Sequence, residues 1–356
     1  MSFLKVTEKI VLNKLKKMKY GNLKLINYDG KVFHFGNLES ALSADIKINS
    51  PKFYFNIISG GSSALGEAHM NKDFYTSNLT NLIEISARNI ELVYSFSGSL
   101  KIKKIKNFLK SIFASNTKSK SLKYISKHYD LGNNFFSKWL DKTLTYSSAV
   151  YENENDSLEV AQKNKYQKLI NLLDVKDGNK VLEIGCGWGG FSEYLAKNYN
   201  VSIDCITISK KQFEFTKKRI SDSGLNNKVN VLFLDYRDLR DKYDKIASIE
   251  MIEAVGENYL SKYFETIKKS LKENGSAAIQ GITIRDDLYD RYRRSEDFIQ
   301  KYIFPGGFLP SVNLIKTLIK RNNLNLTKVN FYPDDYAKTL ASWRVNFFKA
   351  WDNLTP

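Results

Sequence analysis

A glycine-rich turn between Lys180 and Lys197 has the residue types to hold a nucleotide. The stretch KVLEIGCGWGGFSEYLAK begins with apolar residues, places four glycines within six positions and ends in a helix-like pattern. Glycine lets the backbone turn sharply and approach a ligand closely. Glycines that serve only close packing give the same pattern, so the turn alone does not identify the ligand.

Three neighbouring features distinguish between the nucleotides that this turn could hold. Glu183 stands two residues before Gly185, where a carboxylate can meet a cationic or amine-bearing ligand. The next strand ends in CITISKKQ, without the acid that binds the ribose of a dinucleotide. Asp235, in FLDYRDL, ends the third strand and is well placed for an adenine amine. We therefore expect S-adenosylmethionine (SAM) rather than NAD, in an arrangement that resembles the class I SAM methyltransferases.

Six separate stretches make the resemblance more specific. From residue 120 onward they are, in order, HYDLGNNFFSKWLDKTLTYSSAVY, GCGWGGFSEYLAK, TISKKQ, DYRDL, EMIEAVGENY and KYIFPGGFLPS. Together they resemble the cyclopropane-fatty-acid synthases and their mycolic-acid relatives. The first hundred residues, with GEAHMNKDF, resemble the small N-terminal domain of the bacterial members that act on phospholipids.

The resemblance also implies which residues hold SAM. Thr207 and Gln212 hold the ribose, which accounts for the missing acid, and Asp235 and Tyr236 lie by the adenine. For Trp188 and Tyr236, a place among the aromatic residues of the core is the alternative interpretation. The expected cofactor-binding residues, Glu183 included, are Tyr146, Ser147, Glu183, Gly185, Gly187, Trp188, Gly189, Thr207, Gln212, Asp235 and Tyr236.

The group that accepts the final proton is where this chain departs from the family pattern. The family often uses a bicarbonate ion held by a Cys, a Glu, a His and a Tyr, and the matching catalytic positions here are Ser148, Glu253, Gln280 and Tyr336. Serine and glutamine also hydrogen-bond an anion, so an altered bicarbonate site is one interpretation. Direct action of Glu253 or Glu250 is another, and both face the ligand only if the strand ends before residue 250. A purely structural Glu253 that caps a helix near residue 256 is the third.

The reaction that the resemblance implies places clear demands on such a site. An isolated alkene attacks the methyl group of SAM and leaves a carbocation on the neighbouring carbon. Water must be excluded, aromatic faces stabilise the cation, and a base takes a proton from the transferred methyl to close the ring. The chain has 22 Phe and 21 Tyr residues from which such walls can be built. We therefore expect a one-carbon transfer to the double bond of an unsaturated phospholipid acyl chain, giving a cyclopropane fatty acid.

Other outcomes stay open at this point. A hydride shift in the same cation would end in a methylene or methyl-branched fatty acid. The enzyme could instead methylate a small soluble nucleophile, or the chain could be a lipid-binding pseudoenzyme. Nucleic-acid methylation is disfavoured, because the Asn/Asp-Pro-Pro-Tyr/Phe motif for a flipped base is replaced by EMIEAVGE.

The motifs lie on a strand–helix alternation that begins at about residue 160. This rhythm predicts an α/β fold, a mostly parallel sheet with helices on both faces and the ligand at the carboxyl ends of the strands. We expect three parts: a small α+β domain at 1–100 with a hairpin around Asp29-Gly30, a basic segment and linker at 101–123, and a methyltransferase domain with a lipid-binding insertion at 124–356.

Charge and composition suggest where the protein acts. The net charge is +17, and segment 101–123 has eight lysines, no acid and an apolar stripe in its first half, which suits an anionic lipid surface. A helix packed on its own protein explains that stripe as well. The sequence has two cysteines, no signal-peptide pattern and no apolar run of membrane-spanning length. We expect a cytoplasmic enzyme at the inner face of the membrane, a homodimer by resemblance, with no metal and no nucleic-acid partner.

Overall fold

The chain forms two compact units in the computed structural model, which describes residues 3–60, 63–97, 116–129 and 131–354. The first unit consists of Met1–Ala114 and Asp290–Pro305, and the second of Ser115–Tyr289 and Gly306–Pro356. The sequence boundary near residue 124 did not anticipate the return of Asp290–Pro305 to the first unit.

The first unit is a four-stranded sheet with helices, as the predicted α+β fold requires. Its strand order is β2-β1-β3-β4, and β1 pairs antiparallel with β2 but parallel with β3. The predicted hairpin is confirmed, because Ile26 pairs with Val32 and Gly30 adopts a φ of +84°. The elements are α1 (Phe3–Leu15), β1 (Asn22–Ile26), β2 (Val32–Gly36), β3 (Ser43–Ile48), α2 (Lys52–Gly60), α3 (Ala64–Met70), β4 (Phe74–Tyr75), α4 (Leu79–Arg88) and α5 (Ile90–Ser97).

The apolar spacing from residue 79 to 96 is typical of one helix, but the structure has two that meet at Asn89. The Asn89 side chain donates to Ile85 O at 2.8 Å and to Tyr20 O at 2.8 Å. Its Oδ1 accepts from Lys19 N and Tyr20 N. Asparagine side chains compete with the helix ladder in this way, and here the competition ties the helix junction to the start of the sheet.

The returning segment packs on α3 of the first unit. It contains the end of α14 (Asp286–Tyr292) and all of α15 (Phe298–Tyr302). Phe298 lies so close to Gly66 that a Cβ there would be 2.4 Å from its ring, and Lys301 pairs with Glu67 at 2.7 Å. The Arg291 guanidinium lies 3.7 Å from the centroid of the Tyr94 ring.

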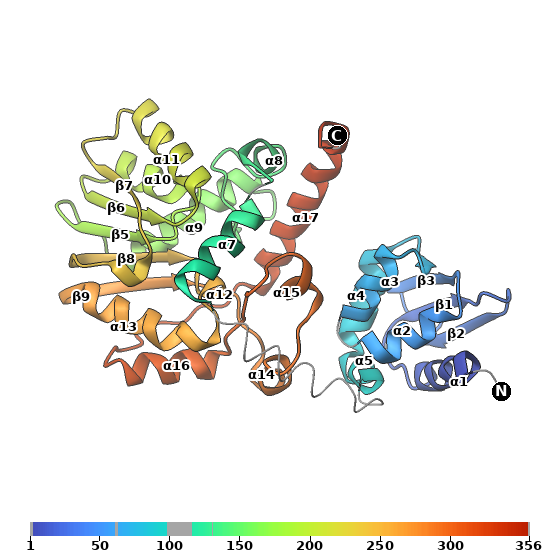
Figure 1. Cartoon of the computed structure of the whole chain (residues 1–356). Coiled ribbons are helices and arrows are strands. Elements are labelled where there is room, and N and C mark those ends of the chain that lie inside the picture. The colour runs from blue at the N-terminus through green and yellow to red at the C-terminus, as the bar shows by residue number, and fades with distance from the viewer. Residues whose placement is uncertain (1–2, 61–62, 98–115, 130, 355–356) are drawn as a thin grey trace. The chain divides into compact units, whose positions relative to one another are not determined.

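The second unit is built around a five-stranded sheet of order β7-β6-β5-β8-β9, in which every pair is parallel (Figure 1). Val181, Leu182, Glu183 and Ile184 are all buried, so helices cover both faces of the central strand. The predicted fold class is confirmed. The strands are β5 (Lys180–Ile184), β6 (Ser202–Thr207), β7 (Val229–Phe233), β8 (Tyr243–Ile249) and β9 (Leu271–Gln280).

The helices of this unit alternate with the strands or frame the site. The larger ones are α7 (Lys118–Tyr129), α9 (Leu158–Leu173), α10 (Gly190–Asn198), α11 (Lys210–Asp222), α13 (Leu260–Ser270), α16 (Val312–Arg321) and α17 (Pro333–Lys349). Two short helices matter for the site, α8 (Asn133–Ser137) and α12 (Ile252–Val255).

Part of the basic segment at 101–123 differs from its predicted structure. The apolar stripe at its front lies outside the described residues, but the Ser/Asn/Thr/Lys part, expected to be a linker, enters helix α7 at Lys118. Thr117 starts this helix, since its Oγ1 accepts from Lys120 N and its carbonyl accepts from Ser121 N. A threonine in the N-cap position offsets the weak helix propensity of the serines that follow.

Candidate active site

The glycine-rich turn joins β5 to α10 at the carboxyl edge of the sheet. Gly185, Gly187 and Gly189 have φ of +81°, +53° and +82°, values that side chains rarely allow. A Cβ on Gly189 would lie 2.6 Å from Thr216 Cγ2, and Thr216 Oγ1 donates to Gly187 O at 3.1 Å. A Cβ on Gly187 would meet nothing within 4 Å, so the space over the centre of the loop is open. The turn is therefore a backbone cradle closed from behind by α11.

Glu183 lies under this cradle and is almost completely buried. Its carboxylate accepts a hydrogen bond from the Ser192 hydroxyl in the first turn of α10. Burial raises the pKa of Glu183 to about 7, and the hydrogen bonds from Ser192 oppose the shift. The structure thus places this carboxylate at the end of β5 as predicted from its position, with one partner already in the protein.

The expected ribose and adenine residues follow the next two strands. Thr207, the last residue of β6, donates from Oγ1 to Gln212 Oε1 at 3.0 Å. Asp235, just beyond β7, accepts from the Arg237 guanidinium at 2.8 and 2.7 Å and from Arg237 N at 2.9 Å. These three donors leave one carboxylate lone pair of Asp235 for a further donor. Tyr236 is buried, and its hydroxyl has no hydrogen-bond partner among the described residues.

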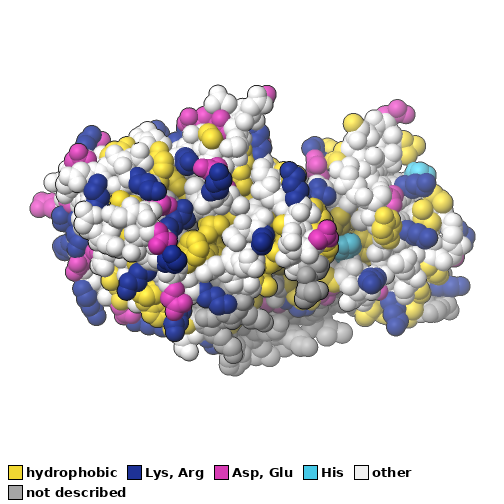
Figure 2. Space-filling model, turned by 90° about the horizontal axis from the view of Figure 1, so that it is seen from above, with side chains coloured by type: hydrophobic (Ala, Val, Ile, Leu, Met, Phe, Trp, Pro, Cys, Tyr) yellow, Lys and Arg dark blue, Asp and Glu magenta, His cyan; other side chains and the backbone are white. Residues whose placement is uncertain are grey.

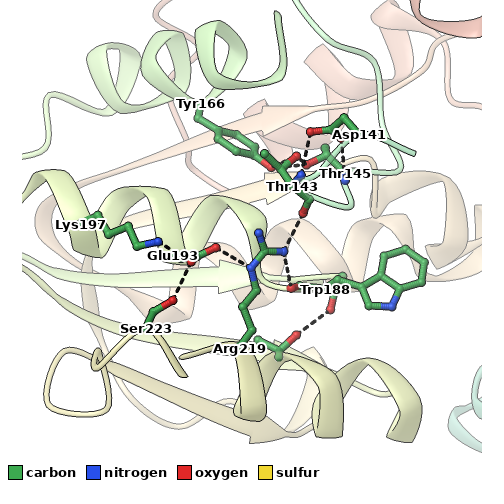
Figure 3. A network of polar contacts seen from close by, with 11 residues as sticks. Asp141, Thr143, Thr145, Tyr166, Trp188, Glu193, Lys197, Arg219 and Ser223 are labelled. Atoms are coloured by element: carbon green, nitrogen blue, oxygen red, sulfur yellow. Dashed lines mark hydrogen bonds and ion pairs between the residues drawn. The ribbon is translucent and has the colours of Figure 1, made fainter. Parts of the chain in front are cut away.

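A polar network fastens residues 141–148, which precede α9, to the glycine-rich turn (Figure 3). Arg219 of α11 donates to Thr143 O at 2.8 Å and to Trp188 O at 3.2 Å, and it pairs with Glu193 at 2.5 Å. Hydrogen bonds from Lys197 and Ser223 and the charge of Arg219 lower the pKa of Glu193 to about 2, against the opposing effect of its burial. One side chain therefore holds the segment that carries Tyr146, Ser147 and Ser148 against the cofactor loop.

An aromatic cluster lies on the same side of the loop. Trp188 is buried, donates from Nε1 to Asn133 Oδ1 at 2.8 Å, and has its ring 5.0 Å from that of Phe136. Tyr146 lies between Trp139 and Trp343, at 5.4 and 5.3 Å between ring centroids. The buried members of this cluster are Phe136, Trp139, Leu140, Trp188 and Trp343. An apolar cluster of this kind would exclude water, as the predicted chemistry requires.

Two carboxylates meet just beyond β8. This strand ends at Ile249, and Glu250 has a φ of +48°, so the chain turns sharply before α12 begins at Ile252. Glu250 and Glu253 therefore do not point to opposite faces as they would in a regular strand. Burial and the charge of Glu250 together raise the pKa of Glu253 to about 8, although Ile282 N donates to Glu253 Oε1. Glu253 Oε2 is buried and has no partner among the described residues.

Glu250 is held by the backbone amide of Ser148 and the side chain of Gln280, whereas the Ser148 hydroxyl, expected to bind an anion, donates to Ala149 O at 3.1 Å. Glu250 Oε1 accepts from Ser148 N at 2.8 Å and from Gln280 Nε2 at 2.9 Å, and Gln280 Nε2 also donates to Ser148 O at 3.0 Å. Tyr336 of α17 lies near enough to both carboxylates to be affected by them: burial and then the charges of Glu250 and Glu253 raise the pKa of its hydroxyl. The four predicted catalytic positions therefore converge, around a carboxylate that the sequence offered only as an alternative.

Two polar residues of the site were not predicted. Lys165 and Gln162 of α9 are fully buried, and they contact Ser147 through Lys165 Nζ to Oγ at 2.6 Å and Gln162 Nε2 to the carbonyl at 2.8 Å. A signal for them exists in the sequence. Lys165 falls on the apolar stripe of α9, midway between Ala161 and Leu169. A charged residue at such an inward-facing position indicates a polar partner inside the protein.

Comparison with known proteins identifies the family. The profile of the mycolic acid cyclopropane synthetases matches residues 116–356, well over half of the chain. The chain belongs to this family. It is 35% identical over 324 residues to the cyclopropane-fatty-acyl-phospholipid synthase of Escherichia coli K12, a match that covers 89% of this chain and 80% of that protein. It is 30% identical over 302 residues to the tuberculostearic acid methyltransferase UfaA1 of Mycobacterium tuberculosis, covering 83% and 70%.

Solved structures agree with this assignment. The cyclopropane synthase MmaA2 from Mycobacterium tuberculosis superposes with a TM-score of 0.62 at 28% identity, over 65% of this chain and 85% of that one. The mycolic acid cyclopropane synthase CmaA1, in complex with SAH and CTAB, gives the same values. The predicted family, the class of SAM-dependent methyltransferase and SAM as the cofactor are thereby confirmed.

The residues around the turn fit SAM. Three features line the carboxyl ends of β5, β6 and β7, which are neighbours in the sheet: the open space over Gly187, the paired side chains of Thr207 and Gln212, and the remaining acceptor of Asp235. That is the order in which a nucleotide lies along such a sheet. The individual contacts of SAM with these residues stay predictions.

Proposed function

We propose that the chain transfers the methyl group of SAM to the double bond of an unsaturated fatty acyl chain in a phospholipid, and that the reaction ends in a cyclopropane fatty acid. The observation that carries this proposal is the convergence of two buried carboxylates, Glu250 and Glu253, beside the glycine-rich turn. Met251, between them, lies so close to Gly185 that a Cβ on that glycine would be 2.8 Å from it. A proton acceptor next to the cofactor loop serves a reaction that must lose a proton after methyl transfer.

The chain's own residues meet the demands of this chemistry one by one. SAM supplies an electrophilic methyl group, which the electron pair of the acyl double bond attacks. The aromatic cluster of Trp139, Tyr146, Trp188 and Trp343 keeps water from the carbocation left on the neighbouring carbon. The base then takes a proton from the transferred methyl, and the electrons of that C–H bond close the ring.

Glu250 is the base that this arrangement favours. The Gln280 amide, expected to hold a bicarbonate, and the Ser148 backbone amide already bind the Glu250 carboxylate, and the Ser148 hydroxyl is directed to Ala149 O. A second anion there would meet like charge, so direct action of a carboxylate is favoured over a held ion. Glu253, whose pKa is raised to about 8, is protonated at neutral pH and acts beside Glu250 as a neutral acid. Added bicarbonate is expected to leave turnover unchanged, and stimulation would instead support a held ion.

The decisive experiment identifies the product. The protein is incubated with methyl-labelled SAM and vesicles of monounsaturated phospholipid, and the fatty acids are released and examined by mass spectrometry. A labelled acid heavier by one CH₂, with the double bond replaced by a ring, supports the proposal. Labelled SAM products without any modified acyl chain would overturn it, since they would indicate methylation of another nucleophile.

A second outcome has its own support. The match to the tuberculostearic acid methyltransferase spans 70% of that protein, and the base of this chain is a carboxylate instead of the family's usual ion. If a hydride shift moves the cation to the carbon that carries the new methyl before the ring closes, loss of a proton from that methyl gives a methylene acid. The same mass gain with a retained double bond in the product distinguishes this branch from ring closure.

Docking on anionic membranes is the second part of the proposal. None of the helices among the described residues is both long and apolar enough to cross a bilayer. Figure 2 shows Lys and Arg side chains spread over the visible face with acids among them, so the overall charge of +17 is distributed rather than gathered there. The eight lysines of 101–123 are the densest basic stretch, and each is worth about 1 kcal/mol at an anionic surface. Binding to anionic vesicles should fall as salt rises, and equal binding to neutral vesicles would exclude the electrostatic contribution.

A further inference from the structure

Lys165 is a buried cation that the proposed chemistry does not use. It lies in the middle of α9 with 1% of its surface exposed. Its Nζ donates to Ser147 Oγ at 2.6 Å and lies 5.5 Å from the centroid of the Tyr166 ring. Burying a lysine is costly, and a methionine of similar volume would fill the same space without that cost. A purely structural account of Lys165 is therefore incomplete.

The backbone at Ser147 and Ser148 lies between this cation and the Glu250 carboxylate. On one side, Lys165 holds the Ser147 hydroxyl and Gln162 holds the Ser147 carbonyl at 2.8 Å. On the other side, the next amide, Ser148 N, donates to Glu250 Oε1 at 2.8 Å. Both serines are buried, so solvent does not compete for these groups. Two adjacent residues thus transmit the position of α9 to the carboxylate.

We propose that Lys165 is a positioning residue for Glu250: it fixes Ser147 so that the Ser148 amide points at the carboxylate, and it supplies the buried positive charge opposite it. Gln162 shares the first task but carries no charge. The proposal rests on the function proposed above only for the role of Glu250 as base. The geometry and the charge relation hold for any role of that carboxylate.

Lys165 and Glu250 each shift the pKa of the other. Burial lowers the pKa of Lys165 to about 7, and Glu250 is the first of the carboxylates that oppose this, ahead of Asp141 and Glu183. Burial likewise raises the pKa of Glu250, and the charge of Lys165 is the strongest opposing effect. The other charged or titratable groups facing Glu250 are Glu253 and Tyr336. Removing Lys165 therefore takes away the strongest opposing effect and leaves only the hydrogen bonds from Ser148 N and Gln280, so the pKa of Glu250 should rise further.

The test is the pH dependence of kcat in Lys165→Met. A base works when deprotonated, so kcat rises with pH through the pKa of Glu250. In Lys165→Met this rise should move to higher pH by about one unit or more, as expected for loss of an opposite charge. At neutral pH kcat should fall by about 10²-fold, the usual effect of a misplaced catalytic group. Lys163→Met, on the same helix but exposed and paired with Glu159, should leave both values unchanged.

A second variant separates position from charge. Gln162→Leu removes the hydrogen bond to the Ser147 carbonyl and leaves the cation, so kcat should fall without a shift of the pH profile. Lys165→Arg keeps the cation and should restore the profile even if kcat stays low. If Lys165→Met unfolds, Lys165→Gln is measured in its place, since its amide can still reach the Ser147 hydroxyl.

A spectroscopic measurement keeps this proposal separate from the proposed function. Infrared difference spectra are recorded without lipid, once between the wild type and Glu250→Gln and once between Lys165→Met and the double variant with Glu250→Gln. Each difference spectrum isolates the carboxyl group of Glu250. At one neutral pH, the protonated carboxyl band should be stronger in Lys165→Met than with Lys165 present. An unchanged band together with an unshifted pH profile would overturn the role of Lys165. A changed band with no activity on any acyl lipid would overturn the proposed function and leave this inference standing.

Discussion

The cofactor side and the proton-accepting side of the site lie at the same edge of one sheet, but they are built from different groups. On the cofactor side, Gly185, Gly187 and Gly189 shape the backbone and side chains contribute little to the cradle itself. On the proton-accepting side, polar groups from five separate segments come together, belonging to the buried Ser148 and Lys165 and the half-buried Glu250, Gln280 and Tyr336. A backbone cradle tolerates change in its neighbours. A cluster of buried charges does not, because each member sets the ionisation of the others.

The largest effect should come from removing the base. Glu250→Gln keeps the shape of the side chain and removes the proton acceptor, so kcat should fall by about 10²–10⁴-fold. SAM affinity, measured by calorimetry, should change little because the cradle is untouched. Glu253→Gln resembles the protonated form that Glu253 has at neutral pH, and it should retain far more activity than Glu250→Gln near pH 7. An equal loss in both variants, or a greater one in Glu253→Gln, would assign the proton transfer to Glu253.

The same division explains what could be predicted from sequence. The cofactor side is formed by contiguous motifs, so the sequence predicted the strands β5, β6 and β7 and the glycine turn, although β7 ends at Phe233, two residues before Asp235. The carboxylates could not be placed, because their orientation depends on the left-handed turn at Glu250, which no local pattern requires of a glutamate. Lys165 was missed because helical periodicity predicts that a side chain is buried but does not predict which groups that side chain contacts.

The first unit shows a second limit of sequence reasoning. Its hairpin was predicted from Asp29-Gly30, a local turn signal. Its use of Asp290–Pro305 was not, because Phe298 and Lys301 find Gly66 and Glu67 across more than two hundred residues of intervening chain. Contacts of that kind depend on tertiary packing and leave no periodic pattern.

A further loss is expected when the polar network that joins residues 141–148 to the glycine-rich turn is broken. Arg219→Met removes the donors that tie Thr143 and Trp188 together and leaves the largely buried Glu193 without its main charge partner. The free energy of unfolding should fall by about 3 kcal/mol, the upper end for hydrogen bonds that involve charged groups. Lys218→Met, on the same helix and exposed, is the matched control.

The pH dependence of this stability difference identifies its source. The pKa of Glu193 is lowered to about 2, so its contribution is fully present above its ordinary value near 4.5 and is lost as pH falls towards 2. The stabilities of the wild type and of Arg219→Met, measured by denaturant unfolding, should therefore converge on acidification. A constant difference between them would show that the ion pair does not matter and that the carbonyl contacts alone carry the effect.

A smaller effect is expected on the cofactor side. Asp235→Ala should weaken SAM binding by about 1–3 kcal/mol if it removes a buried acceptor for the adenine amine. The measurement is calorimetry without lipid, and Asp238→Ala, an exposed neighbour paired with Lys118, is the control. Unchanged SAM affinity would mean that Asp235 serves only to hold Arg237, its partner in the unliganded protein.

The last expected effect is a change in the slope of stability against pH. Glu253 keeps its proton up to about pH 8 in the folded state, whereas the unfolded chain releases it near 4.5. Between these values the folded state binds the extra proton, so the free energy of unfolding decreases as pH rises, by at most about 1.4 kcal/mol per pH unit from this group. Glu253→Gln cannot titrate and should flatten that decline, while Glu257→Gln, a carboxylate nearby in the chain, should leave it unchanged. Denaturant unfolding of the three proteins at pH 5, 6.5 and 8 measures the slopes. Parallel slopes would show that Glu253 is ionised in the folded protein, and the neutral partner assigned to Glu250 would then have to be abandoned.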